Sequence, residues 1–224
     1  MSYSEIMRSL VYTIAQKSRL KSPYVVCVSG IDGSGKGYIS EKLSAHIRNM
    51  GLSCALIGTD GWLQPPSKRF SEHAPGRHFY ECGFRFDEMQ KQLYEPLCSS
   101  GSIDFIAKHS DPTDTEEMVN YHYQIHQSDV IIFEGIFLLQ DRFTYDYSVW
   151  IECSYDTALD RALKRNQEGL SKARIKSDYH NIYFAAQRIH IENDDPRGRC
   201  DFILLNDDLL SIDGGGHNKR FSCS

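Results

Sequence analysis

The sequence predicts an α/β fold in which a parallel sheet of about five strands is flanked by helices. Short, continuous apolar runs are typical of strands that are buried on both faces. Segments with helical spacing separate these runs. A glycine-rich turn joins the first run to the helix that follows it. Strands that alternate with helices pair in parallel through right-handed crossovers, so we expect one such sheet.

The elements follow in order along the chain. The predicted strands are residues 24–28, 54–57, 130–133, 147–151 and 202–205. The predicted helices are residues 4–20, 39–50, 86–97, 154–166 and 178–192. Gly51 ends the second helix, and Ser154 is placed to cap the fourth. We expect residues 61–85 and 101–128 to be loop-rich insertions over the carboxyl edge of the sheet, where α/β proteins bind ligands. Within the second insertion, residues 118–126 alternate and are rich in aromatic and β-branched residues, which predicts a strand.

Composition limits the function classes. The chain has 224 residues and a formal charge of −5, which argues against non-specific nucleic-acid binding. No apolar stretch approaches the roughly 20 residues of a membrane span, and the charged N-terminus does not resemble a signal peptide. We therefore expect a cytoplasmic protein without a membrane partner; a homo-oligomer stays open. We expect a single domain over residues 1–224, with its core at about 22–207 and a flexible tail at about 211–224.

A phosphate-binding loop is the strongest motif in the chain. Residues 30–36 read Gly-Ile-Asp-Gly-Ser-Gly-Lys, which fits G-x-x-x-x-G-K between a predicted strand and a predicted helix. Glycines let successive N–H groups point into one concavity, and the helix adds its partial positive charge. The motif predicts ATP as the ligand. The predicted nucleotide-binding residues are Gly30, Asp32, Gly33, Ser34, Gly35, Lys36, Gly37 and Tyr38.

One position departs from the pattern of this P-loop. The residue after the lysine is normally Ser or Thr, whose hydroxyl binds Mg²⁺, but here it is Gly37. Phosphate binding should survive, because the backbone and Lys36 provide it. Glycine at position 37 therefore puts only the binding of Mg²⁺ in question.

Two carboxylates end buried strands and complete the candidate chemistry. Asp60 follows the second strand and Glu134 follows the third, so both should lie at the carboxyl edge beside the P-loop. Phosphoryl transfer needs a metal ligand and a group that accepts the proton of the acceptor hydroxyl. The alternative is that Asp60 caps a turn and that Glu134 is only a solvent-exposed polar residue at the end of a strand.

The motifs together resemble the uridine kinase, phosphoribulokinase and pantothenate kinase group of P-loop kinases, and most of all its bacterial uridine kinase-like members. The resemblance covers roughly residues 22–207. It is carried by residues 30–36, Thr59-Asp-Gly-Trp62, His78-Phe-Tyr-Glu81, Arg85-Phe-Asp87, Phe133-Glu-Gly-Ile136 and Ala185-Ala-Gln-Arg-Ile-His190.

The resemblance also implies roles. Asp60 would be the general base and a metal ligand, and Glu134 would help to hold Mg²⁺. Arginines of a lid that begins near Ser154 would bind phosphates, and the matching candidates are Arg161 and Arg165, then Lys172 and Arg174. The matching acceptor-site candidates are Trp62, Asp87, His109 and Arg174. Trp62 could instead belong to the core, and the segment around His109 matches the nucleoside kinases only loosely.

The sequence therefore predicts an ATP- and Mg²⁺-dependent kinase that phosphorylates a hydroxyl of a small metabolite, with a nucleoside such as uridine as one candidate. The rival is a nucleotide-binding regulatory module, or a degenerate kinase, with little turnover. Gly37 favours the rival, whereas Asp60 and Glu134 favour the enzyme. The sequence does not identify the acceptor.

Overall fold

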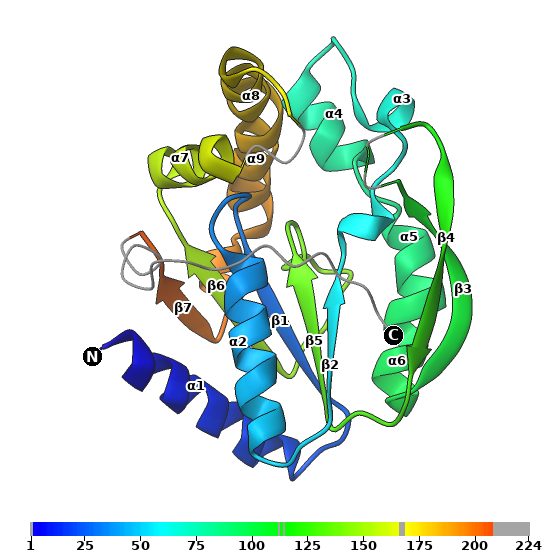
Figure 1. Cartoon of the computed structure of the whole chain (residues 1–224), viewed down its shortest axis with the longest axis vertical. Coiled ribbons are helices and arrows are strands. Elements are labelled where there is room, and N and C mark those ends of the chain that lie inside the picture. The colour runs from blue at the N-terminus through cyan, green and yellow to red at the C-terminus, as the bar shows by residue number, and fades with distance from the viewer. Residues whose placement is uncertain (1, 112, 114, 166–168, 208–224) are drawn as a thin grey trace.

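A five-stranded parallel sheet forms the centre of the molecule (Figure 1). The computed structural model describes residues 2–111, 113, 115–165 and 169–207. The strand order is β2-β5-β1-β6-β7. The strands are β1 Tyr24–Gly30, β2 Cys54–Gly58, β5 Val130–Gly135, β6 Tyr147–Glu152 and β7 Phe202–Leu205. All four pairings between them are parallel, which confirms the predicted α/β class and all five predicted strands.

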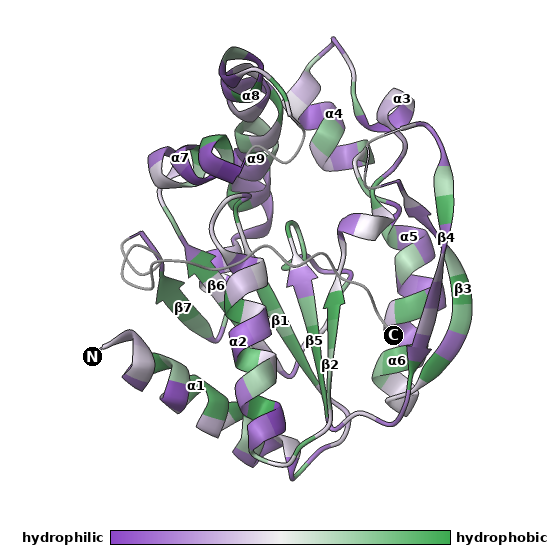
Figure 2. Ribbon diagram, in the orientation of Figure 1, coloured by the Kyte–Doolittle hydropathy of each residue, from purple (hydrophilic) through white to green (hydrophobic). Residues whose placement is uncertain are grey.

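Both faces of the sheet are covered, as its continuous apolar strands require. On one face, Val26 and Val28 of β1 pack in a cluster with residues of α1 and α2. On the other, Val25 and Cys27 join a larger cluster that includes residues of α4, α5 and α9. Hydropathy follows this division: the central strands are apolar over most of their length, with a hydrophilic end on β5, while α2 alternates between apolar and polar residues (Figure 2).

The helices lie on both sides of this sheet. They are α1 Tyr3–Ser18, α2 Lys36–Asn49, α3 Pro66–Arg69, α4 Pro75–Cys82, α5 Phe86–Met89, α6 Glu95–Ser100, α7 Tyr155–Arg165, α8 Lys172–Asp178, α9 Phe184–Asp194 and α10 Pro196–Arg199. Short 3₁₀ and π-helical turns are η1 Asp60–Trp62, η2 Gln90–Tyr94 and η3 Tyr179–Tyr183. The π-helical turns join their neighbours into two longer helical runs, α5 to α6 and α8 to α9.

Local sequence signals explain where several helices start. Ser2 and Glu5 form a capping box at the start of α1. The Ser154 hydroxyl accepts a hydrogen bond from the Thr157 N–H at 3.2 Å, so the predicted cap of α7 is present. Gly51 follows α2 with φ +80°, a conformation that suits glycine at a helix end.

Three expectations need correction. Residues 61–85 are not mainly loop, because they contain α3 and α4. Residues 101–128 are not loop-rich, because they contain an antiparallel hairpin of β3 Ile103–Ser110 and β4 Met118–Ile125. Apolar residues alternate along both strands, and that alternation gives the hairpin its one packed face. The helix predicted at residues 178–192 begins earlier, at Lys172 of α8, because the Ser171 side chain caps α8 by accepting a hydrogen bond from the Arg174 N–H. The predicted tail 211–224, and Asn166 at the end of the fourth predicted helix, lie outside the described residues.

Within the described part of the chain, no helix combines the length and the apolar character that crossing a membrane requires.

Candidate active site

The turn after β1 has the backbone of a phosphate-binding loop. Gly33 and Gly35 have φ of +76° and +91°, which side chains rarely tolerate. A Cβ on Gly33 would lie 2.5 Å from the Ala158 carbonyl oxygen, so the loop also needs glycine for its approach to α7. Helix α2 starts at Lys36, and its first N–H groups face the turn. This arrangement favours an anion at the start of α2.

Lys36 and Ser34 supply polar groups at this turn. The Lys36 side chain is buried, with 7% of the residue exposed, and its ammonium donates to the Ile31 carbonyl at 3.1 Å. Its ammonium therefore folds back over the loop. The Ser34 hydroxyl is buried, and no hydrogen-bond partner for it is found among the described residues. Orphaned polar groups are rare in folded proteins, so this hydroxyl fits a loop that receives a polar ligand.

The P-loop is held from the side of β7. The Ser34 carbonyl accepts from Arg161 at 3.3 Å and from the Asn206 amide at 2.5 Å. Arg161 also donates to the Asn206 carbonyl at 2.6 Å. Arg161 was expected to be a phosphate-binding lid residue, but its guanidinium is engaged with backbone carbonyls of the loop and of the segment after β7. Its place in the structure is that of a support for the loop.

Glu134 and Asp60 meet at the carboxyl edge because of the strand order. Strand β5 lies between β1 and β2, and its Glu134 pairs in register with Val28 on one side and Gly58 on the other. The Thr59 N–H donates to the Glu134 carbonyl at 2.9 Å, which continues the pairing to the residue before Asp60. Glu134 therefore lies beside the P-loop strand β1, and Asp60 lies one strand farther along the same edge of the sheet.

The charges at this edge interact strongly. Burial raises the pKa of Glu134 to about 7, with Lys36 opposing the shift and the Asp60 and Asp32 carboxylates adding to it. Asp60 keeps an exposed side, yet the protein packed around it raises its pKa as well; Lys36 opposes this shift and Asp32 adds to it. Carboxylates that share one site and one cation behave in this way. An added cation would relieve the repulsion among them.

Asp32 links the P-loop to the other helices. Its carboxylate accepts from the Tyr179 hydroxyl and from the Gly33 N–H, and Arg165 lies 3.9 Å away. Burial would raise the pKa of Asp32, but Lys36, Arg165 and these hydrogen bonds hold it below its usual value. Arg165 therefore faces the site, unlike Arg161 on the same helix.

The residues at this edge of the sheet could hold Mg²⁺ only together with a phosphate ligand. Among the described residues, no group of three or more His, Cys, Asp or Glu side chains could hold a metal ion. Asp60 and Glu134 supply carboxylate oxygens, and Gly37 supplies no side chain. Mg²⁺ commonly keeps several waters and is bound by one or two carboxylates plus substrate phosphates. The donor set suits a metal that arrives with a phosphate ligand.

The acceptor-site candidates are placed differently from one another. Trp62 is fully buried in the larger cluster and its indole N–H donates to the Tyr123 hydroxyl at 2.9 Å, so it belongs to the core and offers no free face for stacking. His109 lies on the packed face of the hairpin, stacked on Tyr121 with 4.3 Å between ring centroids. A Cβ on Gly61 would lie 2.2 Å from Nδ1 of His109. The hairpin thus packs directly against the residue that follows Asp60.

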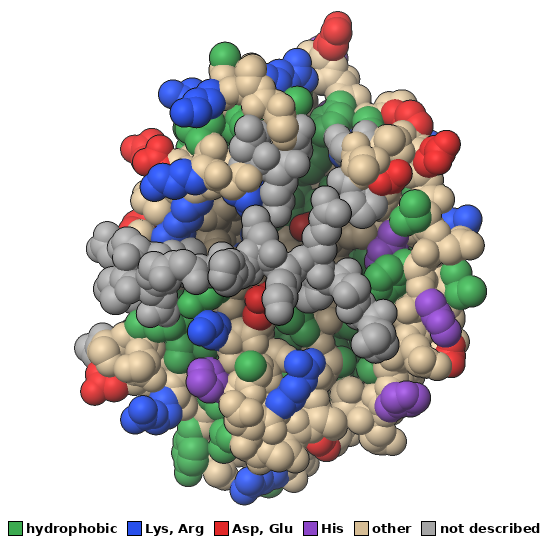
Figure 3. Space-filling model, viewed as in Figure 1, with side chains coloured by type: hydrophobic (Ala, Val, Ile, Leu, Met, Phe, Trp, Pro, Cys, Tyr) green, Lys and Arg blue, Asp and Glu red, His purple; other side chains and the backbone are tan. Residues whose placement is uncertain are grey.

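Asp87 and Arg174 lie away from the P-loop contacts. The Asp87 side chain is 87% exposed, pairs with Arg142 at 2.7 Å and lines an open groove of about 530 Å³ that also includes Arg85. Arg174 pairs with Asp178 of its own helix at 2.8 Å and is exposed. Its helix α8 also carries Lys172 and Lys176. Figure 3 shows separate Lys and Arg side chains on the surface of this part of the molecule.

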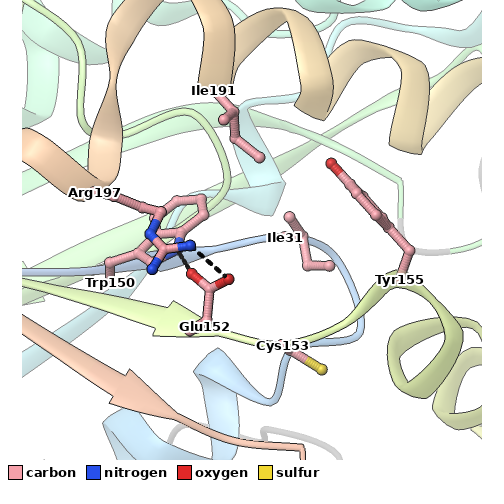
Figure 4. Close-up of a pocket in the computed structure, with 7 residues that line it drawn as sticks. All are labelled: Ile31, Trp150, Glu152, Cys153, Tyr155, Ile191 and Arg197. Atoms are coloured by element: carbon pink, nitrogen blue, oxygen red, sulfur yellow. Dashed lines mark hydrogen bonds and ion pairs between the residues drawn. The ribbon is translucent and has the colours of Figure 1, made fainter.

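A second, smaller cavity lies beside Ile31 of the P-loop. It measures about 100 Å³ and is bordered by Ile31 and Ile191. Glu152 lies between the Trp150 indole N–H and Arg197, which are 2.8 and 3.2 Å from its two oxygens (Figure 4). The volume of this cavity is below that of drug-sized ligand sites, so the cavity is too small for a nucleotide.

Comparisons with known proteins agree with this geometry. No family model matches the chain. It is 27% identical over 169 residues to a uridine kinase of Streptococcus mutans, which covers 72% of this chain and 78% of the relative. It is 24% identical over 204 residues to a uridine kinase of Anoxybacillus flavithermus, covering 88% and 89%.

Solved structures share the fold. A protein of Bacillus stearothermophilus described as a possible uridine kinase has a TM-score of 0.65 and 20% identity, covering 88% of this chain and 98% of its own. D-glycerate 3-kinase of Cryptococcus neoformans has a TM-score of 0.58 and 13% identity, covering 83% and 89%. The chain is a homologue of uridine kinases and has the P-loop kinase fold. The predicted fold class and family resemblance are both confirmed.

In this P-loop kinase fold, some contacts at the site were not anticipated from the sequence. Tyr179 reaches Asp32 from 147 positions away, and Asn206 supports Ser34 from 172 positions away. The one available signal for Asn206 was its place directly after a short apolar strand, the same kind of signal that identified Asp60 and Glu134. Tyr179 carried no local signal, because its helix could present any face.

The surroundings of His109 predict that the free energy of unfolding depends on pH. Burial lowers the pKa of His109 from 6.5 to about 4, and the nearby Arg85 guanidinium adds to the shift. The Trp62 indole N–H can only donate, so the Tyr123 hydroxyl oxygen accepts this hydrogen bond. The Tyr123 hydroxyl can then donate its own proton to Nε2 of His109, and a nitrogen that accepts a hydrogen bond belongs to a neutral imidazole. Its stabilising effect should be present above pH 6.5 and be lost as the pH falls toward 4.

Denaturant unfolding at pH 7 and pH 5 would test this. The parent should lose up to about 2 kcal/mol more of its unfolding free energy than His109→Gln over this interval. Because the comparison subtracts the other titrating groups, parallel losses in the two proteins would show that His109 does not remain neutral in the fold.

Proposed function

We propose that the chain is an ATP-dependent phosphotransferase that phosphorylates a hydroxyl of a small metabolite. One observation carries the proposal: Lys36 of the P-loop and the strand-end acids Asp60 and Glu134 interact electrostatically at one edge of the sheet. Similarity to uridine kinases over most of the chain supports the same class of reaction. A structural glycine turn would not need a buried lysine facing two carboxylates.

Each residue has a role in this proposal. ATP supplies the γ-phosphoryl group and Mg²⁺ neutralises phosphate charge when both are bound. The P-loop N–H groups and Lys36 hold the phosphates. Glu134 would hold the metal, with Asp60 beside it. Asp60 accepts the proton of the acceptor hydroxyl, and its raised pKa suits a general base that works near neutral pH.

The acceptor is the open part of the proposal, and a nucleoside such as uridine is the first candidate. The aromatic face of the hairpin near Asp60, with His109 stacked on the half-exposed Tyr121, is compatible with a planar ring. An acceptor screen tests the function: nucleosides, pantothenate, glycerate and sugar phosphates are each added to protein with ATP and Mg²⁺, and ADP formation is followed. We expect one class to raise the rate well above ATP hydrolysis alone.

A nucleotide-binding regulatory module is the second candidate function. Gly37 favours it, because the position that normally ligates Mg²⁺ lacks a hydroxyl. Such a module would bind ATP with little dependence on Mg²⁺, and no acceptor would stimulate ADP formation. The screen with and without Mg²⁺ therefore separates the two functions.

Arg165 and Arg161 should affect the reaction differently, although both lie on α7. Arg165 faces the carboxylates of Asp32 and Asp60. Arg165→Ala should slow transfer by about 10²-fold, the scale of a lost donor to transition-state charge, with ATP affinity nearly unchanged. Arg161→Ala should instead weaken ATP binding, because Ser34 loses its support. Single-turnover kinetics beside ATP titration checks both, and equal losses for the two variants would contradict the assignment.

Gly37 gives a direct test of metal binding. Position 37 is exposed, and a Cβ there would meet no other atom within 4 Å, so Gly37→Ser should be accommodated. Serine adds an oxygen for Mg²⁺ and removes the cost of glycine in the first helical turn, up to about 1 kcal/mol. The variant should reach half-maximal rate at a lower Mg²⁺ concentration, with acceptor affinity unchanged.

The measurement is a Mg²⁺ titration of activity at saturating ATP and acceptor. Gly37→Ala is the matched control, since it stiffens the backbone without adding an oxygen and should leave the Mg²⁺ requirement near that of the parent. Overlapping curves for serine and glycine would show that position 37 does not contact the metal.

A further inference from the structure

Arg85 occupies a central place beside the Asp60 turn, although it comes from the segment before α5. Its side chain is only 9% exposed, and its guanidinium lies over the ring of the buried Trp62, 5.1 Å from the ring centroid. The planar fork of arginine can donate in several directions at once. At this position the fork is directed at three different segments of the chain.

The first contacts are to the turn that carries Asp60. The guanidinium donates to the Gly61 carbonyl at 3.2 Å and to the Leu63 carbonyl at 3.4 Å. The Arg85 N–H also donates to the Trp62 carbonyl at 2.8 Å. Three consecutive carbonyls after Asp60 are therefore held by one residue.

The remaining contacts reach the hairpin and α5. Arg85 donates to the Lys108 carbonyl of β3 and pairs with Glu88 of α5 at 2.7 Å. The hairpin in turn holds Asp60 itself, because the Ser110 hydroxyl donates to the Asp60 carbonyl at 3.3 Å. The hairpin, the turn and α5 thus meet at one guanidinium.

We propose that Arg85 is a positioning residue that fixes the carboxylate of Asp60 for proton transfer by tying its turn to the β3–β4 hairpin. This inference rests on the proposed function, in which Asp60 is the general base. Among the described residues, the Arg85 side chain bonds to the turn after Asp60, to β3 and to Glu88, and none of these partners belongs to the P-loop, so its effect should pass through Asp60. A displacement of a reacting group by about 1 Å can cost 10²-fold in rate, so a loosened turn should lower kcat markedly.

A double-mutant cycle tests this directly. Arg85→Met keeps most of the side-chain volume and removes the fork; we expect kcat to fall by about 10- to 100-fold, with ATP affinity unchanged. In the Asp60→Asn background the same change should have almost no further effect on kcat, because the group that Arg85 positions is already lost. Glu88→Gln is the matched control: it removes the ion pair, leaves the carbonyl contacts, and should retain parental kcat.

Two additional measurements keep the inference testable if Arg85→Met folds poorly. Arg85→Lys retains the charge and the apolar stem but not the fork, and it should show an intermediate loss of kcat. Hydrogen exchange at the amides of Trp62 and Leu63, which donate to Thr59 and Asp60, should become faster in both variants. Exchange needs no acceptor, so it reports on the turn even if the screen finds no kinase activity.

Two results would overturn the positioning role of Arg85, and a third would remove its catalytic meaning. Unchanged amide exchange in the Arg85 variants would show that the turn does not depend on Arg85. Equal fold losses of kcat in the parent and Asp60→Asn backgrounds would show a general structural role instead of positioning. Amide exchange could become faster in the Arg85 variants while no acceptor is phosphorylated by the parent. That result would reject the kinase function, and Arg85 would then stabilise the turn without a role in catalysis.

Discussion

Replacing Lys36 with methionine should weaken ATP binding by about 10- to 100-fold, the expected loss of charge-assisted hydrogen bonds to phosphate. The rate of transfer should fall by a further 10²–10³, because the ammonium also stabilises the transferring group. Methionine keeps the buried stem in place, whereas alanine would leave a gap beside the Ile31 carbonyl. Calorimetric ATP titration and single-turnover kinetics measure the two effects separately.

The Lys36 variant should also change the acids around it. Lys36 opposes the raised pKa values of Asp60 and Glu134, so its loss should raise both further. Lys91→Met, which removes an exposed lysine from η2, is the control and should bind ATP as the parent does. Unchanged ATP affinity in Lys36→Met would contradict the assignment of the P-loop.

Asp60→Asn should lower kcat by about 10²–10⁴, the usual scale for loss of a general base, and should leave ATP affinity nearly unchanged. Asparagine keeps the size of the side chain but cannot accept the acceptor's proton at neutral pH. Glu134→Gln should act differently, by raising the Mg²⁺ concentration required for activity. Rapid-quench measurement of one turnover, at saturating ATP and acceptor, distinguishes these outcomes.

The Asp60 variant has a clear contrary result. If it transfers phosphate at the parental rate with a true acceptor, proton removal is not limited by Asp60 and another group must be the base. A rise in the Mg²⁺ requirement without a fall in the maximal rate would instead place Asp60 among the metal ligands alone.

The sheet and its edge were predictable because their signals are local. Strands buried on both faces appear as continuous apolar runs, and parallel strands bring their carboxyl ends to one edge. The acids after two such runs could therefore be placed beside the P-loop from the sequence alone. The glycines of the loop were predictable for the same reason, since Gly33 and Gly35 have a positive φ, which glycine adopts most readily.

The remaining contacts depend on the direction in which a side chain points, and periodicity does not give that direction. Arg161 and Arg165 share one helical face by their spacing, yet one supports Ser34 and the other faces Asp32. Trp62 could have faced a ligand or the core, and the aromatic residues of the hairpin decide for the core. Strand β4 of the hairpin was predictable from its alternation. Strand β3 was missed because charged residues such as Asp104 and Lys108 occupy its outer face, which made the segment read as a loop.

The most direct test of the central claim is a single turnover with γ-labelled ATP, Mg²⁺ and each acceptor of the panel, with the products resolved by mass spectrometry. The proposed function predicts that label appears on a hydroxyl of one acceptor class in the parent, and that Asp60→Asn and Lys36→Met each reduce this product at least about 100-fold. Label that remains on ATP, or that appears only in inorganic phosphate with every acceptor, would contradict the kinase function and favour a nucleotide-binding regulatory module.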